Sequence, residues 1–126
     1  MSSITASEMK YLLTIEEIGQ NVKMVAIAKK LGITKASVFH SIERLEKKNL
    51  VKKEEFVALT ADGEKILSEF HSIRNWMKHH LVDKCGVPEE IANEDSINVI
   101  SSLSDVTREK AAAVFAKSGL YGNCNE

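Results

Sequence analysis

Residues 25–45 read VAIAKKLGITKASVFHSIERL, and this stretch decides the fold of the chain. The pattern predicts a short helix, a tight turn at Gly32 and a longer second helix. Gly32 tolerates the left-handed backbone that ends a helix, and Thr34 stands where it can cap the next one. Two helices joined steeply by such a turn form a helix-turn-helix, whose second helix can enter a DNA major groove. The inner residues expected are Val25, Ala28 and Leu31 in the first helix and Val38, Ile42 and Leu45 in the second.

The opposite face of the second helix is small, polar or basic, as contact with DNA requires. Basic side chains there can bind phosphate or guanine, hydroxyl and imidazole groups can bond to base edges, and alanine permits close approach. An ordinary amphipathic helix with a solvated face is the alternative. Residues 50–60, LVKKEEFVALT, argue against it, because two short strands around a charged tip make a basic hairpin and predict a winged helix. The predicted DNA-binding residues are Thr34, Lys35, Ala36, Ser37, His40, Arg44, Lys47, Lys52 and Lys53.

The charge distribution agrees with this interpretation. The net charge of the 126 residues is −1, but the segment from Lys23 to Lys53 holds nine basic residues against two acids, Glu43 and Glu46. This segment therefore carries +7 and the rest of the chain −8, the distribution expected when one half binds DNA. A solvated run of charge is the alternative. Glu54 and Glu55 at the hairpin tip point the other way, since they would lie near phosphates.

The composition favours a small globular protein of one unit or two subdomains, with 44% hydrophobic and 28% charged residues. No apolar run approaches the ~20 residues of a membrane span, and the N-terminus lacks a signal-peptide pattern. Cys85 and Cys124 have neither metal-type spacing nor the look of a disulfide framework. We therefore expect a cytoplasmic protein without a membrane partner.

Helices are also expected on both sides of the helix-turn-helix. The first begins at Ser7, closes at residues 19–21 and completes a three-helix core. Thr60 can cap a long helix that continues through Lys84 and carries the chain to a second subdomain. The expected inner residues are Met9, Leu12, Ile15 and Ile18 in the first helix and Ile66, Phe70, Ile73, Met77 and Leu81 in the long one.

Two further helices follow the long one. Residues 88–90, Pro-Glu-Glu, form a strong helix start, and Ser104 with Asp105 can cap a last helix through Lys117 that contains Val106, Ala113, Val114 and Phe115. Helices this short cannot bury much apolar surface alone, so a second copy of the chain is the simplest partner. Two-fold symmetry would then match a palindromic operator with half-sites about 10 bp apart. The predicted dimerisation residues are Ile91, Ile97, Ile100, Leu103, Val114 and Phe115.

The sequence resembles the iron- and manganese-dependent repressors, the family of the diphtheria toxin repressor and the manganese transport regulator. The resemblance covers nearly the whole chain and lies in the order and spacing of its segments: residues 8–15, 27–31, 37–38, 45–51, 59–63, 86–90 and 103–104. It lacks the SH3-like domain of the iron branch and is shorter than the manganese branch. The resemblance implies a mainly α fold, a winged helix-turn-helix followed by a helical dimerisation domain, with divisions at 1–65, 66–120 and a flexible tail at 121–126.

The resemblance also implies a metal corepressor, manganese or iron, bound between the first helix, the long helix and the helix after it. The corresponding positions here are Lys10, Leu13, Arg74, Asn75, Ile97, Ile100 and Ser101. A lysine ammonium opposes a cation, and leucine or isoleucine cannot bind one. We therefore predict no cofactor and no metal ligands, with the old metal pocket filled by apolar packing. A relocated metal site among His71, His79, His80 and Cys85 is the alternative, although exposed histidines are the plainer interpretation.

The function expected from these features is that of a homodimeric, sequence-specific DNA-binding transcription regulator, a repressor in type. One alternative is a winged-helix interaction or accessory module without specific DNA binding. Another is a metal-responsive repressor with a relocated site. An enzyme is not expected, because the sequence has no phosphate-binding glycine loop, no nucleophile elbow and no convergent acid/base pair.

Overall fold

The computed structural model describes residues 4–118, which fall into two compact units. The first, here the winged unit, comprises residues 7–67, and the second, the helical unit, comprises residues 4–6 and 68–118. The fold is mainly α, a winged helix-turn-helix followed by a helical domain, as the sequence predicts. The predicted tail, Gly119 and Cys124 lie outside the described residues, and the domain limits given above stay predictions.

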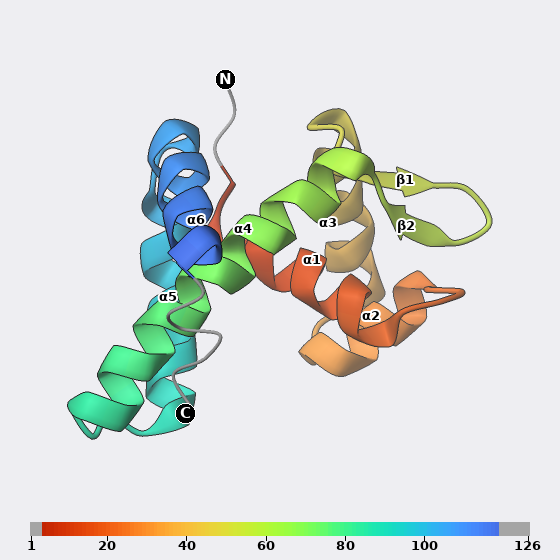
Figure 1. The fold of residues 1–126 in the computed structure, drawn as a ribbon. Coiled ribbons are helices and arrows are strands. Elements are labelled where there is room, and N and C mark those ends of the chain that lie inside the picture. Colours follow the sequence, from red (N-terminus) through yellow and green to blue (C-terminus); the bar gives the residue numbers. More distant parts are fainter. Residues whose placement is uncertain (1–3, 119–126) are drawn as a thin grey trace. The chain divides into compact units, whose positions relative to one another are not determined.

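The winged unit contains α1 (Ala6–Ile18), α2 (Met24–Leu31), α3 (Lys35–Lys47), strands β1 (Val51–Lys53) and β2 (Val57–Leu59), and the start of α4 (Figure 1). The strands are antiparallel, with Val51 opposite Leu59 and Lys53 opposite Val57. The amide of Val57 also donates to the carbonyl of Val22 at 2.8 Å, so the segment before α2 pairs with the other edge of β2. This hairpin is the predicted wing.

The core of the winged unit contains three of the four inner residues predicted for α1 and all three predicted for α3; the fourth, Ile18, is only half-buried. Met9, Leu12 and Ile15 are at most 2% exposed, and Val38, Ile42 and Leu45 are fully buried. The expectation for α2 is wrong in part, because Val25 is 55% exposed and Ile27 is buried in its place beside Ala28. In a helix of eight residues, two neighbouring apolar stripes were available, and packing against α1 and α3 selects between them.

Helix α4 (Ala61–Lys78) begins at the predicted cap, where the amide of Gly63 donates to Thr60 Oγ1 at 3.1 Å. The hydroxyl of Thr60 in turn donates to the carbonyl of Asn49 at 2.6 Å. This hydrogen bond connects the start of α4 to the residues that follow α3. The α-helix predicted through Lys84 ends at Lys78. The chain continues to Lys84 as a π-helical segment, η1 (His79–Lys84).

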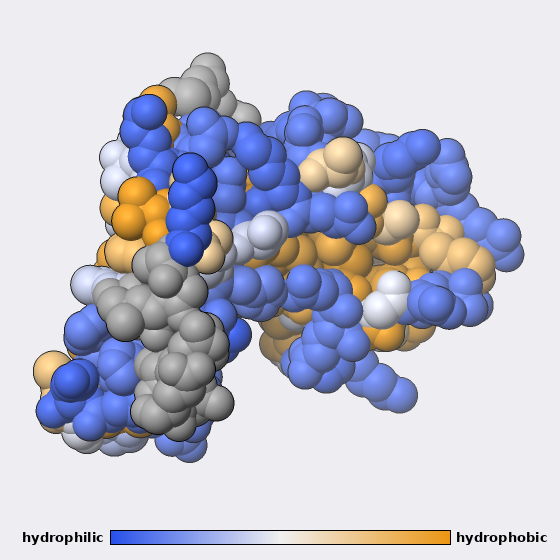
Figure 2. All heavy atoms as spheres, viewed as in Figure 1, coloured by the Kyte–Doolittle hydropathy of each residue, from blue (hydrophilic) through white to orange (hydrophobic). Residues whose placement is uncertain are grey.

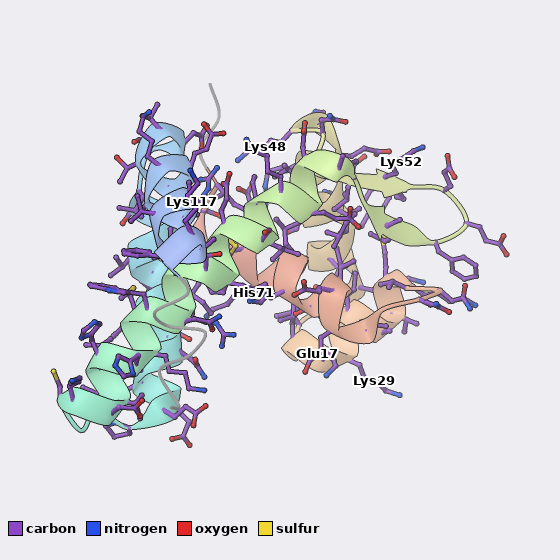
Figure 3. The ribbon with its side chains drawn as sticks, viewed as in Figure 1. Glu17, Lys29, Lys48, Lys52, His71 and Lys117 are labelled. Carbon is purple, nitrogen blue, oxygen red and sulfur yellow. The ribbon has the colours of Figure 1, made fainter. Side chains whose placement is uncertain are left out.

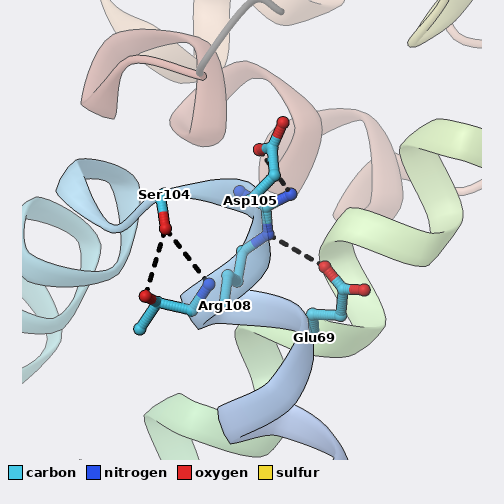
Figure 4. A network of polar contacts seen from close by, with 5 residues as sticks. Glu69, Ser104, Asp105 and Arg108 are labelled. Carbon is cyan, nitrogen blue, oxygen red and sulfur yellow. Dashed lines mark hydrogen bonds and ion pairs between the residues drawn. The ribbon is translucent and has the colours of Figure 1, made fainter.

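The helical unit consists of most of α4, η1, α5 (Glu89–Ser102) and α6 (Asp105–Ser118). Ser104 caps α6 as expected, since its hydroxyl accepts from the amide of Thr107 at 3.1 Å. Helices α4 and α6 are joined by stacking of Trp76 on Phe115, with ring centroids 5.0 Å apart. They are joined again by a buried ion pair, in which Arg108 Nε donates to Glu69 Oε1 at 2.9 Å (Figure 4).

The inner face of α5 is built mostly from small residues. Ala92, Ser96 and Ile100 are fully buried, whereas Ile91, one of the predicted dimerisation residues, is 52% exposed. Ser96 can be buried because its hydroxyl donates to the carbonyl of Ala92 at 2.7 Å. Helix α6 repeats the pattern, because Arg108 and Ala112 point inward while Val106 and Val114 are 57% and 62% exposed. The hydrophobic residues of this unit therefore lie partly on its surface, and small polar groups take their place inside.

Candidate nucleic-acid interface

The turn between α2 and α3 has the backbone that its sequence predicts. Gly32 has φ 67° and ψ 36°, and its amide closes α2 by donating to the carbonyl of Ala28. Thr34 caps α3, since its Oγ1 accepts from the amide of Ser37 at 3.1 Å and the two hydroxyls are 3.0 Å apart. The cap holds the first turn of α3 at a fixed angle to α2, and the amide hydrogens of that turn face solvent.

Two faces of α3 separate cleanly. The core face is lined by Val38, Ile42 and Leu45, and Ser41 is buried beside them. The residues on the other sides are exposed, so all seven helix-turn-helix residues predicted to bind DNA are accessible: Thr34, Lys35, Ala36, Ser37, His40, Arg44 and Lys47.

These exposed side chains differ in how firmly they are held. Arg44 lies back along its own helix, where Nη2 donates to the hydroxyl of Ser41 at 3.0 Å. His40 has a side chain 69% exposed, and its Nδ1 lies 3.9 Å from Glu43 Oε1. A positioned arginine can place its remaining donors on a phosphate or a guanine edge with less loss of side-chain entropy.

The two wing lysines have distinct surroundings. Lys52, labelled on β1 in Figure 3, is 68% exposed and lies 4.0 Å from Glu54 at the hairpin tip. Lys53 is half-buried, with its ammonium 4.3 Å from the centre of the Phe39 ring. Its backbone amide donates to Glu46 Oε2 at 3.4 Å. The contacts of Lys53 therefore connect the wing to α3, whereas Lys52 points its charge toward solvent.

Three of the basic residues counted in the sequence, Lys52 among them, have acidic partners within the winged unit. Lys48 Nζ lies 2.7 Å from Glu8 Oε1, whose side chain is 4% exposed, so this pair supports the core of the unit. Lys30 pairs with Glu17 at 3.2 Å on the surface. The charge that can face DNA is therefore smaller than +7.

Sequence reasoning overlooked two exposed residues of α3, Phe39 and Glu43. Phe39 is 39% exposed and supports Lys53, as described above. Glu43 recurs with Ala36, His40 and Lys47 at spacings of three and four residues, which places it on the same face of the helix. The helical spacing alone predicts that Glu43 lies on this face, but its negative charge is not the one expected for a residue that contacts DNA.

A groove of about 370 Å³ lies elsewhere on the winged unit, where hydrophobic residues reach the surface between polar ones (Figure 2). Two of its lining residues, Glu16 and Glu64, are carboxylates, which would repel phosphate. The groove is therefore no candidate for DNA contact. Its lining comprises Ile15, Glu16, Gly19, Asn21, Phe56, Val57, Ala58, Leu59 and Glu64.

The residues predicted for dimerisation divide by exposure. Ile91 and Val114 are exposed, and Ile97, Leu103 and Phe115 are half-buried. Ile100 is 0% exposed, so a partner chain cannot reach it; the structure corrects this residue to a core position. Val99, which sequence reasoning omitted, is 45% exposed on α5.

The candidate metal ligands do not gather into a site in the part of the chain that the structure describes. Residues 4–118 contain no group of three or more His, Cys, Asp or Glu side chains that could hold an ion. His79 Nδ1 lies 3.2 Å from Asp83, His80 packs on Trp76 at 4.7 Å, and Cys85 is exposed. His71, labelled in Figure 3, packs against Phe70 at 5.6 Å. The rings of His79 and His80 have centroids 5.1 Å apart, so His79 lies beside two possible ligands, His80 and Asp83, whereas His71 packs against an aromatic ring.

Comparison with protein families gives a match in the winged half. The model of the MarR family matches residues 4–55, less than half of the chain. The sequence resemblance had pointed to the iron- and manganese-dependent repressors instead, so the winged helix is common to both and the narrower family is not fixed. No curated protein matches the chain.

Solved structures share the fold over most of the chain. A hypothetical protein, SSo2273 of Sulfolobus solfataricus, is 29% identical with a TM-score of 0.67, and the match covers 90% of this chain and 91% of that one. ScaR with bound Zn2+ is 22% identical with a TM-score of 0.65, covering 86% and 53%. The manganese regulator SloR is 19% identical with a TM-score of 0.64, covering 96% and 55%. The chain spans about half the length of the last two.

These matches show a winged-helix fold for the chain. Among the described residues, none of the helices has both the length and the apolar character needed to cross a membrane.

Proposed function

We propose that this chain is a homodimeric, sequence-specific DNA-binding transcription regulator that acts as a repressor in the cytoplasm. The single observation that carries the proposal is the outward side of α3, which is exposed along its length, polar or basic, and adjacent to a lysine-bearing wing. An α-helix with such a face fits the major groove, and the exposed wing lysine Lys52, whose Nζ lies 4.0 Å from Glu54, can meet a phosphate.

The second copy of the chain is inferred from the helical unit. Ile91, Val99, Val106 and Val114 are each at least 45% exposed on α5 and α6. A second copy of the chain that covers these side chains is the simplest partner. A symmetric dimer supplies two α3 helices, which match a palindromic operator with half-sites about 10 bp apart.

We further propose that repression does not need metal. The positions that correspond to the ligands of the iron- and manganese-dependent repressors are substituted, and Lys10, Leu13 and Ile97 have no donor atom suited to a divalent cation. The donor set therefore does not fit the ion that the fold relatives suggest.

Selection from random DNA followed by binding measurements tests the proposal. The purified chain is first used to enrich an operator. Its affinity is then measured at one fixed salt concentration in chelator, in excess Mn2+ and in excess Fe2+, because phosphate contacts make affinity depend on salt. We expect one palindromic sequence, and affinities in the three conditions that agree within about twofold.

Two results would contradict it. If no sequence is enriched, the chain is an accessory module with a winged fold, and sequence-specific regulation is excluded. If Mn2+ or Fe2+ raises affinity tenfold or more, the protein is metal-responsive. The ligands would then have to be sought among His71, His79, His80 and Cys85.

A further inference from the structure

Two acids lie within the basic segment from Lys23 to Lys53, and the structure gives them different roles. Glu46 Oε2 accepts a hydrogen bond from the backbone amide of Lys53 at 3.4 Å, so Glu46 helps to hold the wing beside α3. Glu43 makes no such connection. Its closest described partner is His40 Nδ1 at 3.9 Å, which is longer than a hydrogen bond.

Glu43 lies in the middle of the outward face of α3. The buried residues Val38, Ile42 and Leu45 follow the spacing i, i+4, i+7, and their counterparts on the other side, Ala36, His40 and Glu43, follow the same spacing. Lys47 continues the line by four residues. The side chain of Glu43 is 47% exposed, so its carboxylate is accessible from solvent. If α3 lies in a groove, this carboxylate lies there too.

A carboxylate in that position is unfavourable unless it meets a hydrogen-bond donor. Phosphates on both edges of the groove repel it. Side chains on the groove-facing side of a recognition helix can reach base edges, whereas those on its flanks meet the phosphate backbone. In the major groove the N4 amino group of cytosine is a donor, and Glu is one of the side chains that accept from it. His40 and Lys47, on either side, cannot substitute as acceptors when they carry a proton.

We propose that Glu43 is a specificity-determining residue, whose carboxylate accepts a hydrogen bond from the N4 amino group of a cytosine in each operator half-site. This inference rests on the proposed function, because it assumes that α3 binds DNA and adds which base the helix recognises. It also explains an acid at the centre of the DNA-facing helix. The contact contributes base preference rather than general affinity, because the charge of Glu43 opposes every DNA sequence equally.

The test repeats the DNA selection with three full-length proteins: the wild type, Glu43→Gln and the control Glu46→Gln. Both variants remove one negative charge from α3, so the general electrostatic gain in affinity is matched between them. Glutamine binds adenine through N6 and N7. We expect the wild type to prefer cytosine at one position of each half-site by roughly tenfold. With Glu43→Gln the preference should change to adenine there, and Glu46→Gln should keep the wild-type sequence.

The outcomes separate this inference from the proposed function. If the wild type enriches no sequence, the proposed function is wrong and the inference falls with it. If the wild type and Glu43→Gln enrich the same operator, regulation stands and the role of Glu43 is excluded. An equal rise in affinity for all sequences in both variants leads to the same exclusion, since it would mean that Glu43 faces the backbone. Circular dichroism of each variant verifies that the exposed substitutions leave the fold intact.

Discussion

The winged unit and the helical unit differ in the side chains that they bury and expose. In the winged unit, large apolar residues such as Met9 and Leu45 are buried, and the exposed side of α3 is mostly polar or charged. The helical unit also has a buried apolar core, but it buries Arg108 as well and exposes Val106 and Val114 at 57% and 62%. These exposed apolar side chains are the ones that the proposed second copy of the chain would cover.

The difference shows that the hydrophobicity of a residue does not by itself determine whether the residue is buried within its own chain. In the helical unit, α6 is attached to α4 through a polar contact, the ion pair of Arg108 with Glu69, extended by Asp105 at 3.0 Å (Figure 4). The same helix also packs Phe115 on Trp76, while Val106 and Val114 of α6 are exposed. Three variants, each with a control, test the roles assigned to residues of the two units.

The largest effect is expected for Arg108→Met. The side chains of Arg108 and Glu69 are 5% and 10% exposed, so the substitution leaves a buried carboxylate without its guanidinium. Removal of one partner of a buried pair costs about 3–5 kcal/mol. Urea unfolding of the variant, followed by circular dichroism, should show a loss of that size in the free energy of unfolding.

The double variant Glu69→Leu/Arg108→Met is the control. Replacement of both charges by apolar groups of similar size is often neutral or stabilising, so it should recover most of the lost stability. If Arg108→Met alone is as stable as the wild type, the pair does not hold α6 in place. The buried ion pair would then not be a difference between the two units that matters for stability.

A smaller effect, on assembly, is expected for Val106→Glu. Val106 is the second residue of α6 and is 57% exposed, and a glutamate near a helix N-terminus does not destabilise the single chain. In a dimer interface the same carboxylate would be desolvated without a partner. We expect the dissociation constant of the dimer, measured by sedimentation equilibrium, to rise by about a hundredfold.

Val25→Glu provides a matched control from the other unit. Val25 is also the second residue of its helix, α2, and is 55% exposed. This variant should assemble like the wild type. If Val25→Glu dissociates the dimer and Val106→Glu does not, the dimer interface lies on the winged unit and not on the helical unit.

The fold of the winged unit could be predicted because its signals are local. Gly32, Thr34 and Thr60 adopt the conformations that their positions predict, and the spacing of Val38, Ile42 and Leu45 describes one buried face. The helical unit was predicted less well at the level of residues. In α5, packing buries the smaller Ala92 and Ser96, which sequence periodicity undervalues, while Ile91 is exposed.

The candidate site shows the same limit. Exposure of the predicted α3 residues follows from helical periodicity, whereas the pairing of Lys48 with Glu8 joins residues 40 apart in sequence and has no local signal. The count of basic residues therefore overestimated the charge available to DNA. Glu43 was overlooked for a different reason, since its place on the outward face is readable but its charge was not expected there.

The smallest effect is expected for Lys52→Ala, which asks whether the wing contributes charge to DNA binding. Lys52 is 68% exposed and supports no core contact. A phosphate-contacting lysine contributes equally at all sequences, so its loss should weaken binding about threefold to fivefold and lower the slope of log affinity against log salt by about 0.9. The preferred operator and the urea midpoint should not change.

Lys48→Ala separates this effect from a simple loss of positive charge. Both variants remove one lysine from the winged unit, but Lys48 is bonded to the buried Glu8 at 2.7 Å. Its removal should cost about 1.5–3 kcal/mol of unfolding free energy, while the salt slope stays that of the wild type. If both variants instead lower the slope of log affinity against log salt alike, DNA affinity depends only on the total charge of the winged unit. The distinction between a lysine that binds phosphate and a lysine that supports the core would then be wrong.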